Sequence, residues 1–314
     1  MQEVWELEFL KKQLRKSKFG LKTQINVNFF KRSKNIIYSS LLKFAILRDN
    51  HNLFYLVFRF RLFIKDVNLK IKKIKIENYI GFEVTDKTTL FKKRFIVKNQ
   101  GYLSYHNGFD FRAYDLGVNT YMLDLIKFSP SDVVFDIGAN LGDLSLYFNS
   151  VNLDIKYYGF EPGFLEFCCL KSNIKENTKN KIFQIALGEK NEFKTFYYKP
   201  ENGDSSLFPI KNFKEKVTVE VKTLDTVIED LGLQDKGIHL LKLEAEGFEP
   251  EVIMGCKKYI HKIKYITADL GFERGVNEES TSPQVINYLL QNNFEIIKQA
   301  RSRNTFLFRL KQNI

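Results

Sequence analysis

The pattern of hydrophobic positions predicts alternating strands and helices from about residue 133 onward. Short apolar runs, typical of buried strands, occupy 133–138, 156–162, 181–188, 238–247 and 265–271. Segments with helical spacing lie between them, at 142–149, 163–177, 250–260 and 282–292. FEIIKQA and NTFLFRL close the chain as an expected hairpin. This alternation predicts an α/β, Rossmann-like domain: a mostly parallel sheet with helices on both faces.

The first 113 residues follow other patterns. Residues 3–17 have the spacing of an amphipathic helix, and 36–64 form two apolar-rich segments broken at Asp49-Asn50. From 66 to about 113 the hydrophobic period approaches two, and Asn107-Gly108 is a typical hairpin turn. We therefore expect short strands there, including GFDFRAYD.

Three regions follow from these patterns. We expect a basic helical N-terminal region over 1–65, a small β-rich segment over 66–113 and the Rossmann-like domain over 114–314. The N-terminal part would then be a basic α+β region that precedes the α/β domain.

The net charge of +12 is concentrated at the start of the chain. Residues 1–100 contain 23 Lys and Arg against 8 Asp and Glu, whereas the remainder has a small acidic excess. Such asymmetry favours an anionic partner for the first third: membrane lipid, nucleic acid or a phosphorylated acceptor. A solvated basic surface without a partner, or an interface of a homodimer, remains open.

The rest of the composition narrows the setting. The chain starts with charged residues and lacks a leader-like apolar region, and its longest apolar run is LFYLVF at 53–58. We expect a cytoplasmic protein, with peripheral contact at the inner face of the membrane left open. The three cysteines are expected to be buried thiols, and no histidine spacing indicates a metal site, so we expect none.

The segment VVFDIGANLGDLSLY at 133–147 indicates a ligand site. A strand that ends in a glycine-rich turn and a helix places a ligand at the carboxyl ends of the strands. Here Asp136 precedes Gly138, Asn140 and Gly142, which follow at every second position. An acid would repel the pyrophosphate of NAD but attract the sulfonium and ammonium groups of S-adenosylmethionine. The charge pattern therefore favours S-adenosyl-L-methionine as the cofactor.

A second acid follows at the end of the next expected strand. Glu161, in GFEP, can accept hydrogen bonds from the two ribose hydroxyls of a nucleoside. Alternatively it caps the next helix, because Pro162 suits a first helical position. The cofactor-binding candidates are Asp136, Gly138, Asn140, Gly142, Glu161 and Ala186.

Candidate catalytic residues cluster in LLKLEAEGFE. If 240–246 is extended, Lys242, Glu244 and Glu246 share one side of the strand, which is costly in a core unless they are paired or functional. Lys242 could orient the acceptor, and Glu244 or Glu246 could accept a proton or bind the cofactor's ammonium. A Lys–Glu ion pair that only closes the strand end is the alternative. Asp269, Glu273 and Arg274 lie near the same rim or in a solvated loop.

Several motifs together resemble those of the FkbM family of S-adenosylmethionine-dependent methyltransferases. They are DIGANLGDLSLYF, GFEP, NIKEN, KTLDTVI, LLKLEAEGFEPEVIMG and DLGFERG, in this order over about residues 114–310. The resemblance implies a class I methyltransferase fold and methylation of a hydroxyl oxygen, often on sugars of surface polysaccharides, glycolipids or secondary metabolites. Many members have Asp where this chain has Glu244, so the acceptor geometry can differ.

The leading hypothesis is an O-methyltransferase acting on a sugar of a surface polysaccharide or glycolipid precursor. An RNA methyltransferase is an alternative, because the basic first third also carries aromatic residues that could stack on bases. No RNA-binding signature is visible, so nucleic acid is the less favoured partner. A non-catalytic, membrane-docked scaffold with a nucleotide-type fold is the third reading.

Overall fold

The computed structural model describes residues 38–177, 179–200 and 203–311. The chain divides into two compact units, residues 1–57 and 58–314. The described part of the first unit contains a helix over 38–47 and the start of α3 (His51–Ile64), separated by a turn at Asp49 with φ of 49°. The expected break at Asp49-Asn50 is thus confirmed, whereas the helix expected at 3–17 lies outside the described residues.

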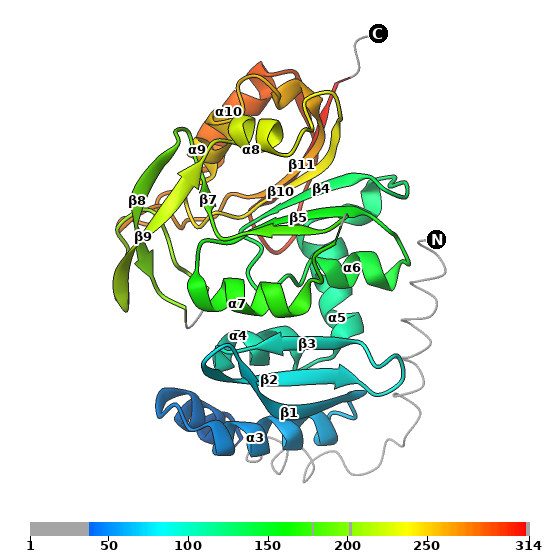
Figure 1. Ribbon diagram of the computed structural model, residues 1–314, viewed down its shortest axis with the longest axis vertical. Helices are drawn as coiled ribbons and strands as arrows, with labels where there is room; N and C mark the ends of the chain where they lie inside the picture. The colour runs from blue at the N-terminus through cyan, green and yellow to red at the C-terminus, as the bar shows by residue number, and fades with distance from the viewer. Residues whose placement is uncertain (1–37, 178, 201–202, 312–314) are drawn as a thin grey trace. The chain divides into compact units, whose positions relative to one another are not determined.

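A mostly parallel sheet forms the centre of the second unit (Figure 1). In the described residues it has seven strands in the order β12-β13-β11-β10-β4-β5-β6. Only β13 runs antiparallel to its neighbours β11 and β12. The strands are β4 (Val133–Ile137), β5 (Lys156–Phe160), β6 (Lys181–Phe183), β10 (Ile238–Leu243), β11 (Ile263–Asp269), β12 (Phe294–Gln299) and β13 (Thr305–Leu310). The order and directions confirm the Rossmann-like α/β class and the C-terminal hairpin.

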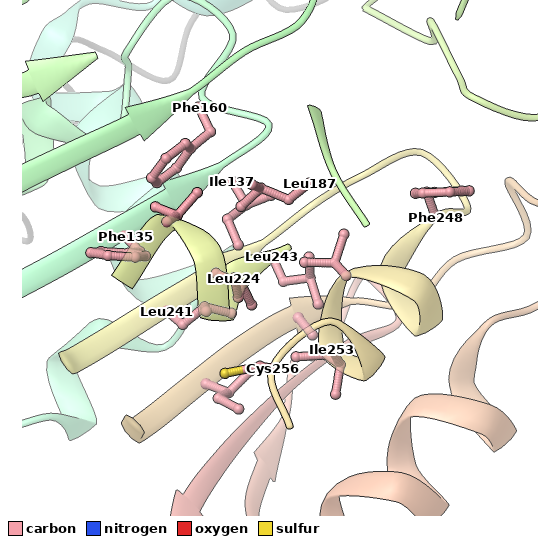
Figure 2. Close-up of a cluster of buried hydrophobic side chains, with 14 of the residues drawn as sticks. Phe135, Ile137, Phe160, Leu187, Leu224, Leu241, Leu243, Phe248, Ile253 and Cys256 are labelled. Carbon is pink, nitrogen blue, oxygen red and sulfur yellow. The ribbon is translucent and has the colours of Figure 1, made fainter. Parts of the chain in front are cut away.

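Helices cover both faces of this sheet, and the alternation along β4 shows why. Phe135 packs into a cluster with side chains of α8, α9 and α10, and Figure 2 shows part of this core around Phe135, Leu241 and Ile253. Val134 points to the other face and packs with α6 and α7. The helices are α6 (Ser145–Ser150), α7 (Phe164–Asn173), α8 (Leu224–Asp230), α9 (Glu249–Met254) and α10 (Ser282–Gln291). A π-helix η1 (Asp115–Thr120) and two 3₁₀-helices, η2 (Leu123–Leu125) and η3 (Ile260–Lys262), accompany them. Because successive strand residues alternate between faces, one strand supplies two separate cores.

A small antiparallel sheet precedes the large one. Its order is β1-β2-β3, with β1 (Leu69–Ile76), β2 (Tyr79–Asp86) and β3 (Lys92–Phe95). Glu83 is 3% exposed and lies in register between Lys72 and Arg94, with which it forms ion pairs of 3.1 and 2.9 Å. Burial opposes ionisation of Glu83, but Arg94 and Lys72 outweigh it and hold its pKa below the usual value.

The expected strand at GFDFRAYD is wrong. Gly108, with φ of 97°, ends a turn after α4 (Lys98–Tyr105), and α5 (Phe109–Tyr114) follows. Phe109 and Ala113, four residues apart, are buried, so helical rather than alternating spacing decides this segment. Whether 1–65, 66–113 and 114–314 are separate regions stays a prediction.

The strand expected at 181–188 is split between two sheets. After β6, the chain turns and β7 (Ala186–Leu187) pairs with β9 (Glu215–Lys222), which also pairs with β8 (Glu192–Tyr198). This places Ala186 in the three-stranded sheet β7-β9-β8, where it pairs with Val221 of β9. No helix within 38–177, 179–200 or 203–311 is long and apolar enough to cross a bilayer.

Candidate functional site

A cavity of about 680 Å³ opens at the carboxyl ends of β4, β5 and β10. It is lined by eight of the nine candidates: Asp136, Gly138, Asn140, Glu161, Ala186, Lys242, Glu244 and Glu246. Gly142, the ninth candidate, is described by the structure but does not line this cavity. The fold therefore brings eight of the nine residues proposed from the sequence to one cavity.

Gly138 sits where no side chain fits. Its φ is 68°, and a Cβ atom built there would lie 1.8 Å from the backbone oxygen of Glu244. The amides of Gly138 and Ala139 both donate to the carbonyl of Phe160, at 3.0 Å each. Because Gly138 has no side chain, the end of β4 can pack closely against the backbone of Glu244, which follows β10.

Gly142 has a packing role in this structure. Its φ is 75°, and an added Cβ would lie 2.9 Å from Leu170 Cδ1 and 3.1 Å from Ile174 Cγ1. The every-second-residue spacing suggested one ligand surface, but the turn directs Gly142 toward α7. The third position, Asn140, adopts φ of 48° and remains in the cavity lining.

Five alternating charges, which we call the charge chain, run across the strand ends: Asp136, Lys242, Glu244, Arg303 and Asp269. Lys242 Nζ lies 3.1 Å from Asp136 Oδ1 and 3.4 Å from Glu244 Oε2. Arg303 Nη2 lies 3.0 Å from Glu244 Oε1 and 2.5 Å from Asp269 Oδ2. Every charge of the chain therefore has an opposite neighbour.

Hydrogen bonds complete the surroundings of the charge chain. Lys242 Nζ also donates to the carbonyls of Ile137 at 3.0 Å and Gly138 at 2.7 Å. Tyr157 donates its hydroxyl to Asp136 Oδ2 at 2.6 Å, and Tyr121 donates to Glu244 Oε2. Lys242 is only 3% exposed. Its hydrogen bonds and ion pairs compensate the free energy that burial of a charged group costs.

The pairing changes what Asp136 and Glu244 can do. Burial disfavours the charge of Glu244, but Lys242 and Arg303 outweigh it and lower its pKa to about 2. Such a carboxylate is a weak base, and both its oxygens are engaged. Asp136 is 1% exposed and paired with Lys242. It is therefore not the unpaired negative charge beside the cofactor that the sequence suggested.

The cavity is nevertheless acidic through other residues. Its described lining has nine Asp and Glu against five Lys and Arg. Glu161, 7% exposed, accepts from the amides of Asn140 and Gly163 at 2.8 Å each. Burial and the neighbouring Glu166 raise the pKa of Glu161 to about 8. At neutral pH a carboxyl with a pKa of about 8 is mostly protonated, so the count of acidic side chains overstates the negative charge that the cavity offers to a cationic ligand.

Glu246 does not share a strand side with Lys242 and Glu244, as the extended pattern predicted. β10 ends at Leu243, and Glu246 has φ of 48° in the turn that follows. Burial and the carboxylates of Glu273 and Glu244 raise the pKa of Glu246 well above its usual value. Burial and Asp269 raise the pKa of Glu273, which also lines the cavity, to about 8.

Some residues of the site carried no recognisable sequence signal. Tyr121 and Arg303 contact Glu244 from positions 123 and 59 residues away in the chain. Arg274, named as a rim residue, instead pairs with Glu251 at 2.6 Å. In the described part of the chain, no group of three or more His, Cys, Asp and Glu could hold a metal ion.

Comparison with known proteins identifies the domain. A family model described as a methyltransferase FkbM domain matches residues 136–296, just over half of the chain. The chain belongs to the FkbM methyltransferase family.

Two curated FkbM-type relatives are similar in sequence. The 31-O-demethyl-FK506 methyltransferase FkbM of Streptomyces tacrolimicus is 25% identical over 168 residues, which cover 44% of this chain and 64% of that protein. The 2-O-methyltransferase NoeI of Sinorhizobium fredii (strain NBRC 101917 / NGR234) is 25% identical over 169 residues, which cover 48% and 68%. The chain thus spans about two thirds of the length of these relatives.

A crystal structure of methyltransferase FkbM from Methylobacillus flagellatus KT is also similar to this chain. The TM-score is 0.42 at 16% identity, and the match covers 60% of this chain and 46% of that one.

The segment before the FkbM match holds the glycine-rich loop from outside. Lys93, which is fully buried, donates to the carbonyl of Gly142 at 2.7 Å and to Ser145 Oγ at 2.9 Å. Tyr105 donates to Asp143 Oδ1 at 2.5 Å, and Arg112 Nε donates to Asp143 Oδ2 at 3.0 Å. Three side chains from β3, α4 and α5 therefore fix the end of this loop.

The buried Lys93 generates a prediction on stability. Burial, opposed by Asp143, lowers its pKa from 10.5 to about 8, so above pH 8 the folded chain releases a proton that the unfolded chain keeps. Stability then rises with pH between about 8 and 10.5. Relative to Lys93→Met, the wild type should gain about 2 kcal/mol from pH 7 to 9.5, at about 1.36 kcal/mol per pH unit.

Urea unfolding of both proteins at the two pH values measures this gain. Lys70→Met, at an exposed position of β1, is the matched control and should leave the pH dependence unchanged. Parallel pH profiles for the wild type and Lys93→Met would contradict the prediction.

Proposed function

We propose that this chain is an S-adenosylmethionine-dependent O-methyltransferase that acts on a hydroxyl of a sugar in a surface polysaccharide or glycolipid precursor. The observation that carries the proposal is the carboxyl-rich cavity at the carboxyl ends of β4, β5 and β10, most of whose lining lies within the FkbM match. The names of both curated relatives specify transfer to an oxygen, which supports a hydroxyl acceptor.

The residues of the cavity fit the proposed cofactor. Glu161 is held by two backbone amides at the end of β5, where a nucleoside ribose is bound in folds of this class. Asn140 Oδ1 is buried and has no hydrogen-bond partner among the described residues, so it can accept from a ligand. Gly138, Asn140, Glu161 and Ala186 would contact the cofactor, whose sulfonium supplies the methyl group.

The charge chain assigns different tasks to the three catalytic candidates. Lys242 and Glu244 form an ion pair, and Lys242 also donates to the carbonyl of Gly138, so together they hold the ends of β4 and β10 in contact. Glu246 lines the cavity, and its raised pKa makes its carboxylate, once ionised, a stronger base toward a hydroxyl proton than an ordinary glutamate. We assign Glu246 as the general base and Lys242 and Glu244 as positioning residues.

Calorimetry with S-adenosylmethionine tests the cofactor assignment. At pH 9, above the pKa of about 8 of Glu161, the wild type should bind, and Glu161→Gln should bind at least tenfold more weakly, because hydrogen bonds to a charged group contribute roughly 1.5–3 kcal/mol. Glu220→Gln, at an exposed position of β9, is the matched control and should bind as the wild type does. A wild-type protein that does not bind would overturn the proposed function.

The pH dependence of turnover tests the general base. The acceptor is identified first by mass-spectrometric comparison of surface glycans from cells with and without the gene. Glu246→Gln should then lower kcat about 10²–10⁴-fold. Because the base acts when ionised, kcat of the wild type should rise with pH through the raised pKa of Glu246.

Glu273→Gln provides the matched comparison for Glu246. Removing this neighbouring carboxylate lowers the pKa of Glu246, so the rise in kcat should move to lower pH while its plateau is retained. A pH profile of Glu246→Gln that equals that of the wild type would exclude Glu246 as the base.

We also propose that α3 and β1 contact an anionic membrane surface. Phe60, Phe63 and Ile64 on α3 are 55%, 81% and 54% exposed, and Arg59 and Lys70 are exposed nearby in the chain. Apolar side chains flanked by cations suit the interface of a bilayer with anionic headgroups.

Sedimentation with lipid vesicles tests this contact. The protein should pellet with vesicles that contain phosphatidylserine but not with neutral vesicles, and Phe63→Ser should reduce pelleting. Leu290→Ser, at an exposed position of α10, is the control. Equal pelleting of Phe63→Ser and wild type, or retention by bulk RNA but not by vesicles, would contradict it.

A further inference from the structure

Gln100 is a cavity residue that lies outside the family match. It belongs to α4, is 6% exposed and lines the same cavity as Glu161 and Asn140. The FkbM match begins at Asp136, so the family motifs do not account for this residue.

The orientation of the Gln100 amide follows from its partners. Its Nε2 donates to Glu166 Oε1 at 3.0 Å and to the carbonyl of Pro200 at 2.6 Å. Both partners accept at these contacts, so the amide nitrogen must face them. The carbonyl oxygen Oε1 is then left buried, with no hydrogen-bond partner among the described residues. Such a group is costly unless a ligand satisfies it.

The neighbours of Gln100 indicate which ligand that is. A Cβ built on Gly203 would lie 3.1 Å from Asn140 Nδ2 and 3.5 Å from Gln100 Nε2, so the two amides are adjacent. A Cβ on Gly163 would lie 2.5 Å from Glu166 Oε2 and 3.0 Å from Glu161 Oε1. Gln100, Asn140 and Glu161 therefore line one contiguous part of the cavity, in which Gln100 donates to Glu166 and the backbone amide of Asn140 donates to Glu161.

We propose that Gln100 Oε1 accepts a hydrogen bond from a ribose hydroxyl of the bound nucleoside cofactor, which makes α4 part of the cofactor site. A vicinal diol supplies two donors, one for Glu161 and one for Gln100 Oε1, whereas an ionised phosphate supplies none. The inference rests on the proposed function, because it requires that an adenosyl cofactor bind here.

The experiment uses the full chain and three ligands: S-adenosylhomocysteine and its 2′-deoxy and 3′-deoxy analogues. Gln100→Met keeps the length of the side chain and removes the acceptor together with the donor to Glu166 and Pro200, so the two deoxy analogues isolate the contribution of the acceptor. It should bind S-adenosylhomocysteine about five- to tenfold more weakly than the wild type, as expected for one neutral hydrogen bond. For the analogue that lacks the contacted hydroxyl, the wild type and Gln100→Met should bind equally.

Controls separate this contact from a change in folding. Gln291→Met, at an exposed position of α10, should bind all three ligands as the wild type does. Should Gln100→Met not fold, Gln100→Ala is compared in the same way. Unchanged binding of S-adenosylhomocysteine, or the same loss for all three ligands, would overturn the role of Gln100 and leave the proposed function intact. A wild type that binds none of them overturns both.

Discussion

The charge chain is the interaction on which the cavity depends. It joins the ends of β4, β10 and β11 to the loop of the C-terminal hairpin through Asp136, Lys242, Glu244, Arg303 and Asp269. Ionised groups are strongly disfavoured in a protein interior unless each has an opposite partner and hydrogen bonds. Because removal of one member would leave its neighbours uncompensated, the chain holds the strand ends in a single arrangement.

The same saturation decides which carboxylates remain for chemistry. A carboxylate between two cations is strongly acidic, and Glu244, with a pKa of about 2, is such a group. Carboxylates outside the chain experience mostly burial and one another, so the pKa of Glu161, Glu246 and Glu273 is raised. Carboxyl groups with lowered and with raised pKa therefore lie in one cavity, and their charged neighbours decide which is which. This divergence of environments is common in catalytic sites.

Sequence reasoning succeeded where a short segment determines its own structure. The strand before Gly138 and the Glu161 position follow from local hydrophobic spacing and turn residues, and both lie at the cavity. It failed where tertiary contacts decide. The turn after Leu243 separates Glu246 from Lys242, and no periodicity signals where a strand ends inside a polar stretch. Tyr121 and Arg303 could not be found, because only the folded sheet brings them to Glu244.

The N-terminal segment shows the same limit at a larger scale. Its basic composition suggested an external partner, yet Lys93 acts internally, as a donor to the carbonyl of Gly142 in the glycine-rich loop. Because the buried Lys93 of β3 donates to the glycine-rich loop, the stability of the loop and that of β3 are coupled. Charge counted along a sequence therefore overstates the charge offered to a partner. Among the described residues of this segment, the lysines of β1 at 70, 72, 73 and 75 are exposed, whereas Lys93 is fully buried.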